Sequence, residues 1–225
     1  MVNYEESFCA NLEHSYRNIF DVLRLGESFM DSTPIFNGAL IAFRRYLFDP
    51  LRPHTIADDT EIALRIREKG YKAVFDPRVV VYAFTPRQFK SRLKQKIRRA
   101  QGIIQSFSWH KNILFNPHYG KYGLIIFPCE FFMFFISPLV FLSIAFLLPL
   151  LFYEVSLSVD QVILILTIVA LFLGLMSTIL YLLKRQSVNP LRFFATFLEH
   201  QIFLILALIS LILRKGTVKW EKIEN

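Results

Sequence analysis

Three long apolar stretches dominate the C-terminal half of this 225-residue chain, and they restrict its fold more than any other feature. They run over Leu124–Tyr153, Val162–Leu183 and Phe193–Leu213. A helix rises about 1.5 Å per residue, so roughly 20 apolar residues cross the hydrocarbon core of a bilayer. The first two stretches meet that length, and Pro residues within the first predict a kinked span. Glu199-His200 interrupts the third, which we expect either to cross the membrane or to be re-entrant or interfacial.

Charges between these stretches predict how they are oriented. The loop Glu154–Gln161 contains no Lys or Arg, whereas the loop Lys184–Arg192 contains three such residues. The positive-inside rule places the first loop outside and the second inside. The first residues lack the basic and apolar regions of a signal peptide. We therefore expect a multi-pass protein of the cell membrane with its N-terminal part in the cytoplasm. Residues 122–213 would form a transmembrane region of two or three helices, followed by a basic tail over residues 214–225.

The overall composition narrows the class of protein. Apolar residues make up 54% of the chain, which is too high a share for intrinsic disorder. The chain has only two Cys residues, which cannot build a disulfide framework and are not spaced as metal ligands. A net charge of +8 in so apolar a chain is typical of a membrane protein with a basic cytoplasmic face.

The polar half of the chain combines helical and β-type patterns, which predicts an α/β fold for residues 1–86. The predicted helices are Met1–Met30, with the apolar residues Phe8, Leu12, Ile19, Leu23 and Leu25, and Asp58–Lys69, which Gly70 ends. The predicted β-type segments are a short strand or turn over Phe36–Phe43 and the runs Tyr71–Phe75 and Val79–Phe84.

A basic amphipathic helix is predicted over Arg87–Phe107, and with its connector it fills residues 87–121. Its apolar stripe is Phe89, Leu93, Ile97, Ala100 and Ile104. The other faces carry seven Arg and Lys residues, and no acidic residue lies between Asp76 and Glu130. Such a helix suits the anionic face of a membrane. A charged face turned to solvent is the simpler alternative, and a nucleic-acid-binding arm is disfavoured because the helix leads directly into the apolar stretches.

An acidic run, Ala57-Asp58-Asp59-Thr60-Glu61, opens the second predicted helix. Asp58 as N-cap with Glu61 three residues later matches a capping box, which is a purely structural role. A carboxylate at a helix N-terminus is also kept ionised by the helix dipole and can accept a proton from a hydroxyl. The two roles are compatible, with Asp58 capping the helix and Asp59 pointing into a site.

Four segments, in order, resemble the family 2 glycosyltransferases, the membrane enzymes that include cellulose, hyaluronan and poly-N-acetylglucosamine synthases. The segments are Asn37–Arg45, Ala57–Ile66, Gly70–Pro77 with Thr85-Pro86, and Gln95–Gly102, followed by the apolar stretches and the tail around Trp220. The resemblance covers nearly the whole chain. It implies that residues 1–86 are the acceptor side of a partial GT-A-like domain, placed ahead of an interface helix and membrane helices.

The resemblance also implies roles for individual residues. Asp59 matches the general base that deprotonates the acceptor hydroxyl, because Ala57-Asp58-Asp59 stands where the family has a T-E-D type of motif. Gln95 and Arg98 match the family's Q-x-x-R-W motif beside the acceptor and the leaving diphosphate, and Arg99 stands where Trp is expected. The acceptor or diphosphate site expected from the resemblance comprises Asn37, Gly38, Asp58, Gln95, Arg98 and Arg99.

The N-terminus departs from the family. Such enzymes bind the nucleotide sugar through an earlier α/β half that carries a D-x-D metal motif, and no D-x-D precedes Asn37. The chain therefore resembles the C-terminal part of such an enzyme. No metal or other cofactor is expected to bind to this chain alone, and a divalent Mg or Mn ion is expected only with the missing half.

The leading interpretation is a C-terminal fragment or subunit of a membrane glycosyltransferase, inactive without a donor-binding half. It would move a sugar from a nucleotide-sugar donor to an acceptor hydroxyl. The expected partners are membrane lipids, the nucleotide sugar, a glycan or lipid acceptor and a separate donor-binding subunit, without nucleic acid. The alternative is a non-catalytic, membrane-anchored interaction protein with a basic cytoplasmic module. A transporter or channel is disfavoured, because the few ionisable residues within the apolar stretches suit span ends or an interface.

Overall fold

The computed structural model describes residues 8–36, 38–81, 89–155 and 190–213, together with residues 160, 161, 163, 167 and 171. Some predicted features lie wholly or largely outside these residues. They are Asn37, Thr85-Pro86, the second apolar stretch Val162–Leu183 and the basic tail around Trp220.

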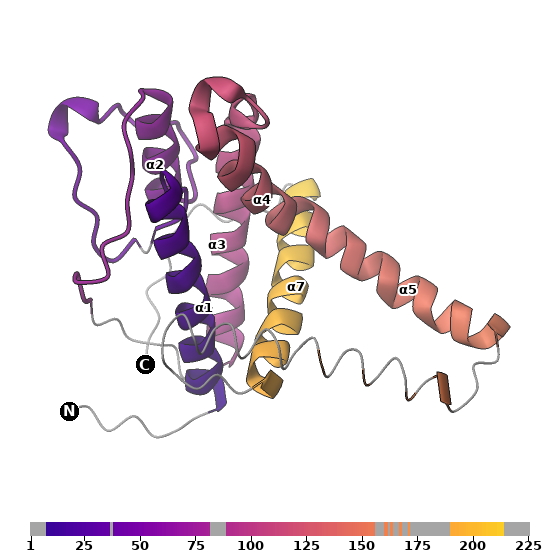
Figure 1. Cartoon of the computed structure of the whole chain (residues 1–225). Helices are drawn as coiled ribbons and strands as arrows, with labels where there is room; N and C mark the ends of the chain where they lie inside the picture. Colours follow the sequence, from indigo (N-terminus) through magenta and orange to yellow (C-terminus); the bar gives the residue numbers. More distant parts are fainter. Residues whose placement is uncertain are drawn as a thin grey trace.

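The described residues form a bundle of helices (Figure 1). The polar half contributes α1 (Phe8–Met30), α2 (Asp58–Glu68) and α3 (Phe89–Trp109), and the apolar half contributes α4 (Phe127–Phe131), α5 (Ser137–Val155) and α7 (Pro190–Ile212). Short 3₁₀ turns lie at η1 (Arg45–Leu47), η2 (Lys111–Ile113) and η3 (Pro117–Tyr119). α3 lies at the centre, since it contacts both α2 and α7, while α7 also contacts α1 and α5.

The first apolar stretch folds as one long helix with two irregular turns. Single π-helical turns, η4 (Tyr122–Ile126) and η5 (Phe132–Ile136), flank the short α4. Such π turns are rare in proteins. The kink that the Pro residues predict stays a prediction. Two helical segments, Tyr122–Leu150 and Phe194–Ile212, are long and apolar enough to cross a membrane. α5 extends away from the other helices (Figure 1). Most of its apolar side chains between Leu139 and Leu150 are exposed.

The hydrophobic core lies where α3 meets the start of the first apolar helix and α7. Phe107 of α3 is fully buried, and its ring packs 4.9 Å from the ring of Phe127 and 5.9 Å from that of Phe134. Leu204 of α7 and Leu64 of α2 close the same core. The predicted apolar stripe of α3 faces this core, as Ala100 and Ile104 are buried in it. The side chain of Phe89, the first residue of that stripe, lies outside the described parts.

α3 is buried on more of its surface than the sequence predicts. The guanidinium of Arg92 is 1% exposed and holds both carboxylate oxygens of Glu199 on α7, with Nη2···Oε2 at 2.9 Å. Lys96 is also buried. The prediction that every basic side chain of this helix faces a membrane or solvent is therefore wrong for these two. The same contact explains the charged break in the third apolar stretch, because Glu199 faces α3 within a continuous helix.

The buried face of α1 also differs from the predicted one. The predicted apolar stripe includes Leu23, which is exposed. The buried row is instead Phe20, Arg24, Glu27 and Asp31, at helical spacing. Polar side chains can be buried on this face because they form hydrogen bonds there. The Thr33 hydroxyl, for example, donates to Glu27 Oε2 at 2.6 Å.

The β-type runs are extended chain in the described residues, and none is assigned as a strand. Hydrogen bonds nevertheless hold the first run on the end of α1. The Thr33 amide donates to the Ala73 carbonyl at 2.9 Å, and the Phe75 amide donates to Ser28 Oγ at 2.8 Å. A strand is defined by pairing with a neighbouring strand. The α/β, GT-A-like fold class of residues 1–86 therefore stays a prediction.

Candidate active site

The acidic run lies at the start of α2, but it does not form the predicted capping box. α2 begins at Asp58 after Ala57, and no side chain caps it. Within the described parts of the chain, the hydrogen bond that Asp58 Oδ1 accepts comes from the neighbouring Asp59 amide, at 3.0 Å. The Glu61 side chain points away into a buried cluster, and its amide donates to the Ala57 carbonyl. The capping prediction is wrong, because Asp58 is already inside the helix and cannot reach the amides that an N-cap side chain serves.

Asp59 is a buried carboxylate with two differently placed oxygens. Its side chain is 9% exposed, and Oδ1 accepts from the Thr60 amide at 2.8 Å. Oδ2 faces Gly38, where an added Cβ atom would lie only 3.3 Å from it. The predicted residues Gly38 and Asp59 therefore meet in space. A side chain at position 38 would press on this oxygen, which gives Gly38 a steric reason to be glycine.

Arg99 of α3 completes this group. Its guanidinium donates to the carbonyl of Phe36, close to Gly38 in the chain. Burial raises the pKa of Asp59 above its usual value, while the positive charge of Arg99 acts in the opposite direction without cancelling the rise. Arg99 thus ties Phe36 to α3 and places a positive charge near Asp59.

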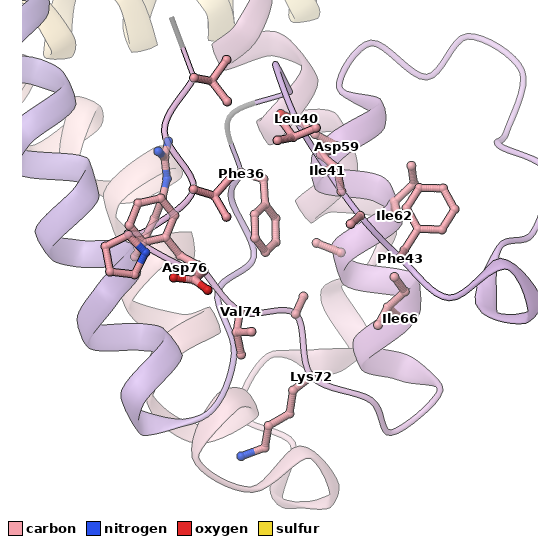
Figure 2. A pocket seen from close by; sticks show the side chains of 18 of the residues that line it. Phe36, Leu40, Ile41, Phe43, Asp59, Ile62, Ile66, Lys72, Val74 and Asp76 are labelled. Carbon is pink, nitrogen blue, oxygen red and sulfur yellow. The ribbon is translucent and has the colours of Figure 1, made fainter.

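A cleft of about 1130 Å³ opens beside Asp59 (Figure 2). Its walls come from α1, Phe36 and the segment over residues 40–47, one face of α2 and the extended run over residues 71–81. Most of the lining is apolar, including Leu40, Ile41, Ile62 and Val74. Asp59 is the deeply buried carboxylate of this lining, so a hydroxyl reaching it would leave water behind.

α3 also fixes the backbone that leads into α2. A Cβ atom added at Gly102 would lie 2.6 Å from Ala57 Cβ and 2.7 Å from Ala57 N, so only glycine lets the two segments approach this closely. Three residues further along α3, Gln105 Oε1 accepts from the Ile56 amide at 3.1 Å. Asp59 therefore stands on a helix start whose preceding residues are held by α3.

A second buried cluster, which the sequence did not predict, joins α2 to the end of α3. His110 lies with Nε2 3.2 Å from Glu61 and Nδ1 2.9 Å from Glu68, and Arg65 donates to Glu61 at 2.8 Å. Burial alone would lower the pKa of His110, but its contacts with the two carboxylates outweigh this effect and raise it. The pKa values of Glu61 and Glu68 are lowered, as these partners outweigh burial. The cluster is suited to holding α2 in place.

The remaining predicted site residues either do not line the cleft or lie outside the described residues. Asp58 and Gln95 are exposed, and Arg98 is half-buried, with its Nε lacking a hydrogen-bond partner among the described residues. Neither Gln95 nor Arg98 is among the described residues that line the cleft. Asn37 lies outside the described residues.

A metal site is a separate question. No group of three or more His, Cys, Asp and Glu side chains is arranged to hold a metal ion within the part of the chain that the structure describes. The divalent ion expected with the donor-binding half stays an expectation.

Comparison with known proteins places the chain in a family. Residues 2–213 match the group described as glycosyl transferase family group 2. The chain belongs to this family. A probable glycosyltransferase of Bacillus subtilis, YdaM, is 29% identical over 211 residues, which covers 84% of this chain and 48% of YdaM. The chain thus spans about half the length of the curated relative that it matches. No solved structure matches it. The family resemblance is confirmed, while the cellulose and hyaluronan synthase subgroup stays a prediction.

Proposed function

We propose that this chain is the acceptor-side half and membrane anchor of a glycosyltransferase that moves a sugar from a nucleotide-sugar donor to an acceptor hydroxyl. The observation that carries the proposal is the buried Asp59, with Gly38 against one oxygen, at the cleft between α1, α2 and the extended runs. Membership of a glycosyl transferase family supports the reaction class. The two long apolar helices support a location at the cell membrane.

In the proposed reaction, Asp59 acts as the general base. The acceptor hydroxyl oxygen attacks the anomeric carbon of the donor, the bond to the nucleoside diphosphate breaks with its electron pair, and the hydroxyl proton passes to the Asp59 carboxylate. A carboxylate whose pKa is raised by burial holds that proton better than an exposed one. Arg98 would offset charge on the leaving diphosphate, because a guanidinium offers paired donors to phosphate oxygens.

We propose further that a donor-binding half completes the enzyme, either as a separate subunit or as additional chain. The length comparison supports this, since the chain matches 48% of YdaM. The exposed apolar side chains of the extended runs also support it. Val74, Val79 and Val80 are between 52% and 68% exposed, which suits contact with another polypeptide segment. That half would bind the nucleotide sugar and the divalent metal. The helices described here would contact membrane lipids or a glycan.

The decisive experiment replaces Asp59 in the assembled enzyme. Asp59→Asn keeps the size of the side chain but cannot take a proton, so transfer should fall by roughly 10²- to 10⁴-fold. The assay measures sugar transfer by the chain combined with its donor-binding half, because we expect no transfer from the chain alone. Asp58→Asn is the matched control and should be milder, since Asp58 is exposed. Near-normal transfer by folded Asp59→Asn would remove Asp59 from the mechanism and favour a non-catalytic, membrane-anchored module.

A further inference from the structure

Two buried carboxyl groups face each other where α1 meets the first apolar helix. Glu27, near the end of α1, is 7% exposed, and Glu130 of α4 is 3% exposed. The two side chains are in hydrogen-bonding contact. The other partner of Glu27 is the Thr33 hydroxyl, which donates to Oε2 at 2.6 Å. Neither carboxyl takes part in the proposed sugar transfer.

Such a contact has a chemical requirement. An ionised carboxylate has only acceptor atoms, so two ionised carboxylates cannot form a hydrogen bond with each other. One of them must carry a proton, and two negative charges this close would repel in a site with little water. Glu130 Oε2 and the hydroxyl of the fully buried Tyr122 also lack hydrogen-bond partners among the described residues. These two oxygen atoms could therefore still form hydrogen bonds near the pair.

The positive charges near the pair are shared with other carboxylates. Arg24 of α1 and Cys129 of α4 act on the pair directly. Tyr122 of the first apolar helix interacts with both carboxyl groups and also with Arg67 of α2 and with Asp31, the residue after α1. Arg24 acts on both carboxyl groups, but it also lies 3.6 Å from Asp21. Arg67 is engaged by Asp31 at 3.2 Å. Burial raises the pKa of Glu27 even though Glu130, Thr33 and Arg24 oppose that rise.

We infer that Glu27 and Glu130 form a proton-binding site, in which one shared proton fastens the end of α1 to the first apolar helix. The proton makes the pair singly charged, so that Arg24 can balance it. Because Thr33 binds the same Glu27, this site also holds the turn that leads to Phe36 and Gly38. The inference stands independently of the proposed sugar transfer, as it needs neither Asp59 nor a donor-binding half.

Infrared spectroscopy of the purified full chain in a detergent that has no carbonyl group tests this site, because a protonated carboxyl group then has its own carbonyl stretching band. At pH 7 the wild-type chain should show this band, and it should fade as the pH is raised. Glu130→Gln should lose it, since an amide can donate to Glu27 without a shared proton. The double variant Glu27→Gln/Glu130→Gln should lose it as well and guards against a folding defect in the single variant.

Asp59→Asn is the matched control, because Asp59 is another buried carboxyl group with a raised pKa. It should keep the band that Glu130→Gln loses. Absence of the band from the wild-type chain at pH 7, its survival in either Glu130 variant, or its loss in Asp59→Asn would each overturn the inference. None of these outcomes depends on whether the chain transfers sugar.

Discussion

Burial and a nearby positive charge shift the pKa of Asp59 in opposite directions, and the effect of each can be measured. Burial disfavours its ionised form, whereas the nearby Arg99 guanidinium favours it. Removing that positive charge leaves burial less opposed, so the pKa of Asp59 should rise further in Arg99→Gln. The base is lost when Asp59 is protonated. The acidic limb of the pH profile of kcat/KM, measured on the assembled enzyme, should therefore move to higher pH.

Arg98→Gln is the control for this shift. Arg98 is the neighbouring guanidinium, and it is not among the groups that shift Asp59. Its loss should lower the rate through weaker binding of the diphosphate and leave the acidic limb in place. An unmoved limb in Arg99→Gln would show that Arg99 does not act on the base.

His110 should make stability depend on pH. Its pKa is raised in the folded chain, so its contribution is complete below about pH 6.5, the pKa of an unperturbed histidine, and is lost as the pH rises through the folded value. Thermal unfolding of the wild-type chain and His110→Gln, compared from pH 6 to pH 9, should show the largest difference at pH 6. The lowered pKa values of Glu61 and Glu68 act only at lower pH, outside this window.

Glu68→Gln removes one of the two carboxylates and should give an intermediate result. A wild-type advantage that stays constant across the window would mean that His110 is not protonated in the folded chain.

At this scale the sequence suggests contacts between neighbouring residues and cannot show distant ones. The acidic run itself offers Asp59, whereas Gly38 entered the expected site only through the family resemblance. The true environment of Glu61 could not be predicted, because its partner His110 lies 49 positions further along the chain. A capping box needs only neighbouring residues, so it was the interpretation that the local sequence offered.

Among the contacts between helices, the one between α3 and the start of α2 depends on glycine at position 102. Gly102→Ala puts a Cβ atom 2.6 Å from Ala57 Cβ, against backbone that cannot rotate away. We expect a loss of about 1–3 kcal/mol in the free energy of unfolding, the usual range for overpacking. Chemical denaturation of the full chain in detergent measures it.

Gly26→Ala on α1 is the matched control, because a Cβ there meets no atom within 4 Å. Alanine at an open helical position should be neutral or should stabilise by about 0.4–1 kcal/mol. Equal changes in the free energy of unfolding at both glycines would mean that the close approach of α3 to Ala57 does not make an added side chain destabilising.

The helices themselves were predictable, but their buried faces were not. Periodicity predicts the bounds of α2 and α3 to within a few residues. The predicted stop at Gly70 is also found, because this glycine follows α2 in a left-handed conformation at φ +84°. It does not reveal that Arg92 faces inward, because only the distant Glu199 makes that burial favourable. The β-type runs carry strand-like composition, but pairing depends on a neighbouring strand that composition does not supply.

On the scale of the whole molecule, the loop charges predict an orientation that can be tested directly. With Cys9 and Cys129 replaced by serine, single cysteines are introduced at Ser156 or at Ser187. An impermeant thiol reagent added to intact cells should label position 156 and spare position 187, because the basic loop is expected inside. Labelling of position 187 alone would reverse the orientation.

The two π turns give the first apolar helix a counting constraint. Each π turn accommodates one residue more than an α-helix would over the same length. Deleting one residue from either turn would restore α-helical winding there and leave the residues beyond it on nearly the same faces, whereas a deletion in an ordinary α-helical turn would rotate everything beyond it by about 100° around the helix axis. Ser137, whose hydroxyl donates to Gln201 Oε1 of α7 at 3.1 Å, would keep its side after the first deletion and lose it after a deletion within α4. The two π turns are therefore the places where this helix can lose a residue without changing the direction in which α5 leaves the bundle.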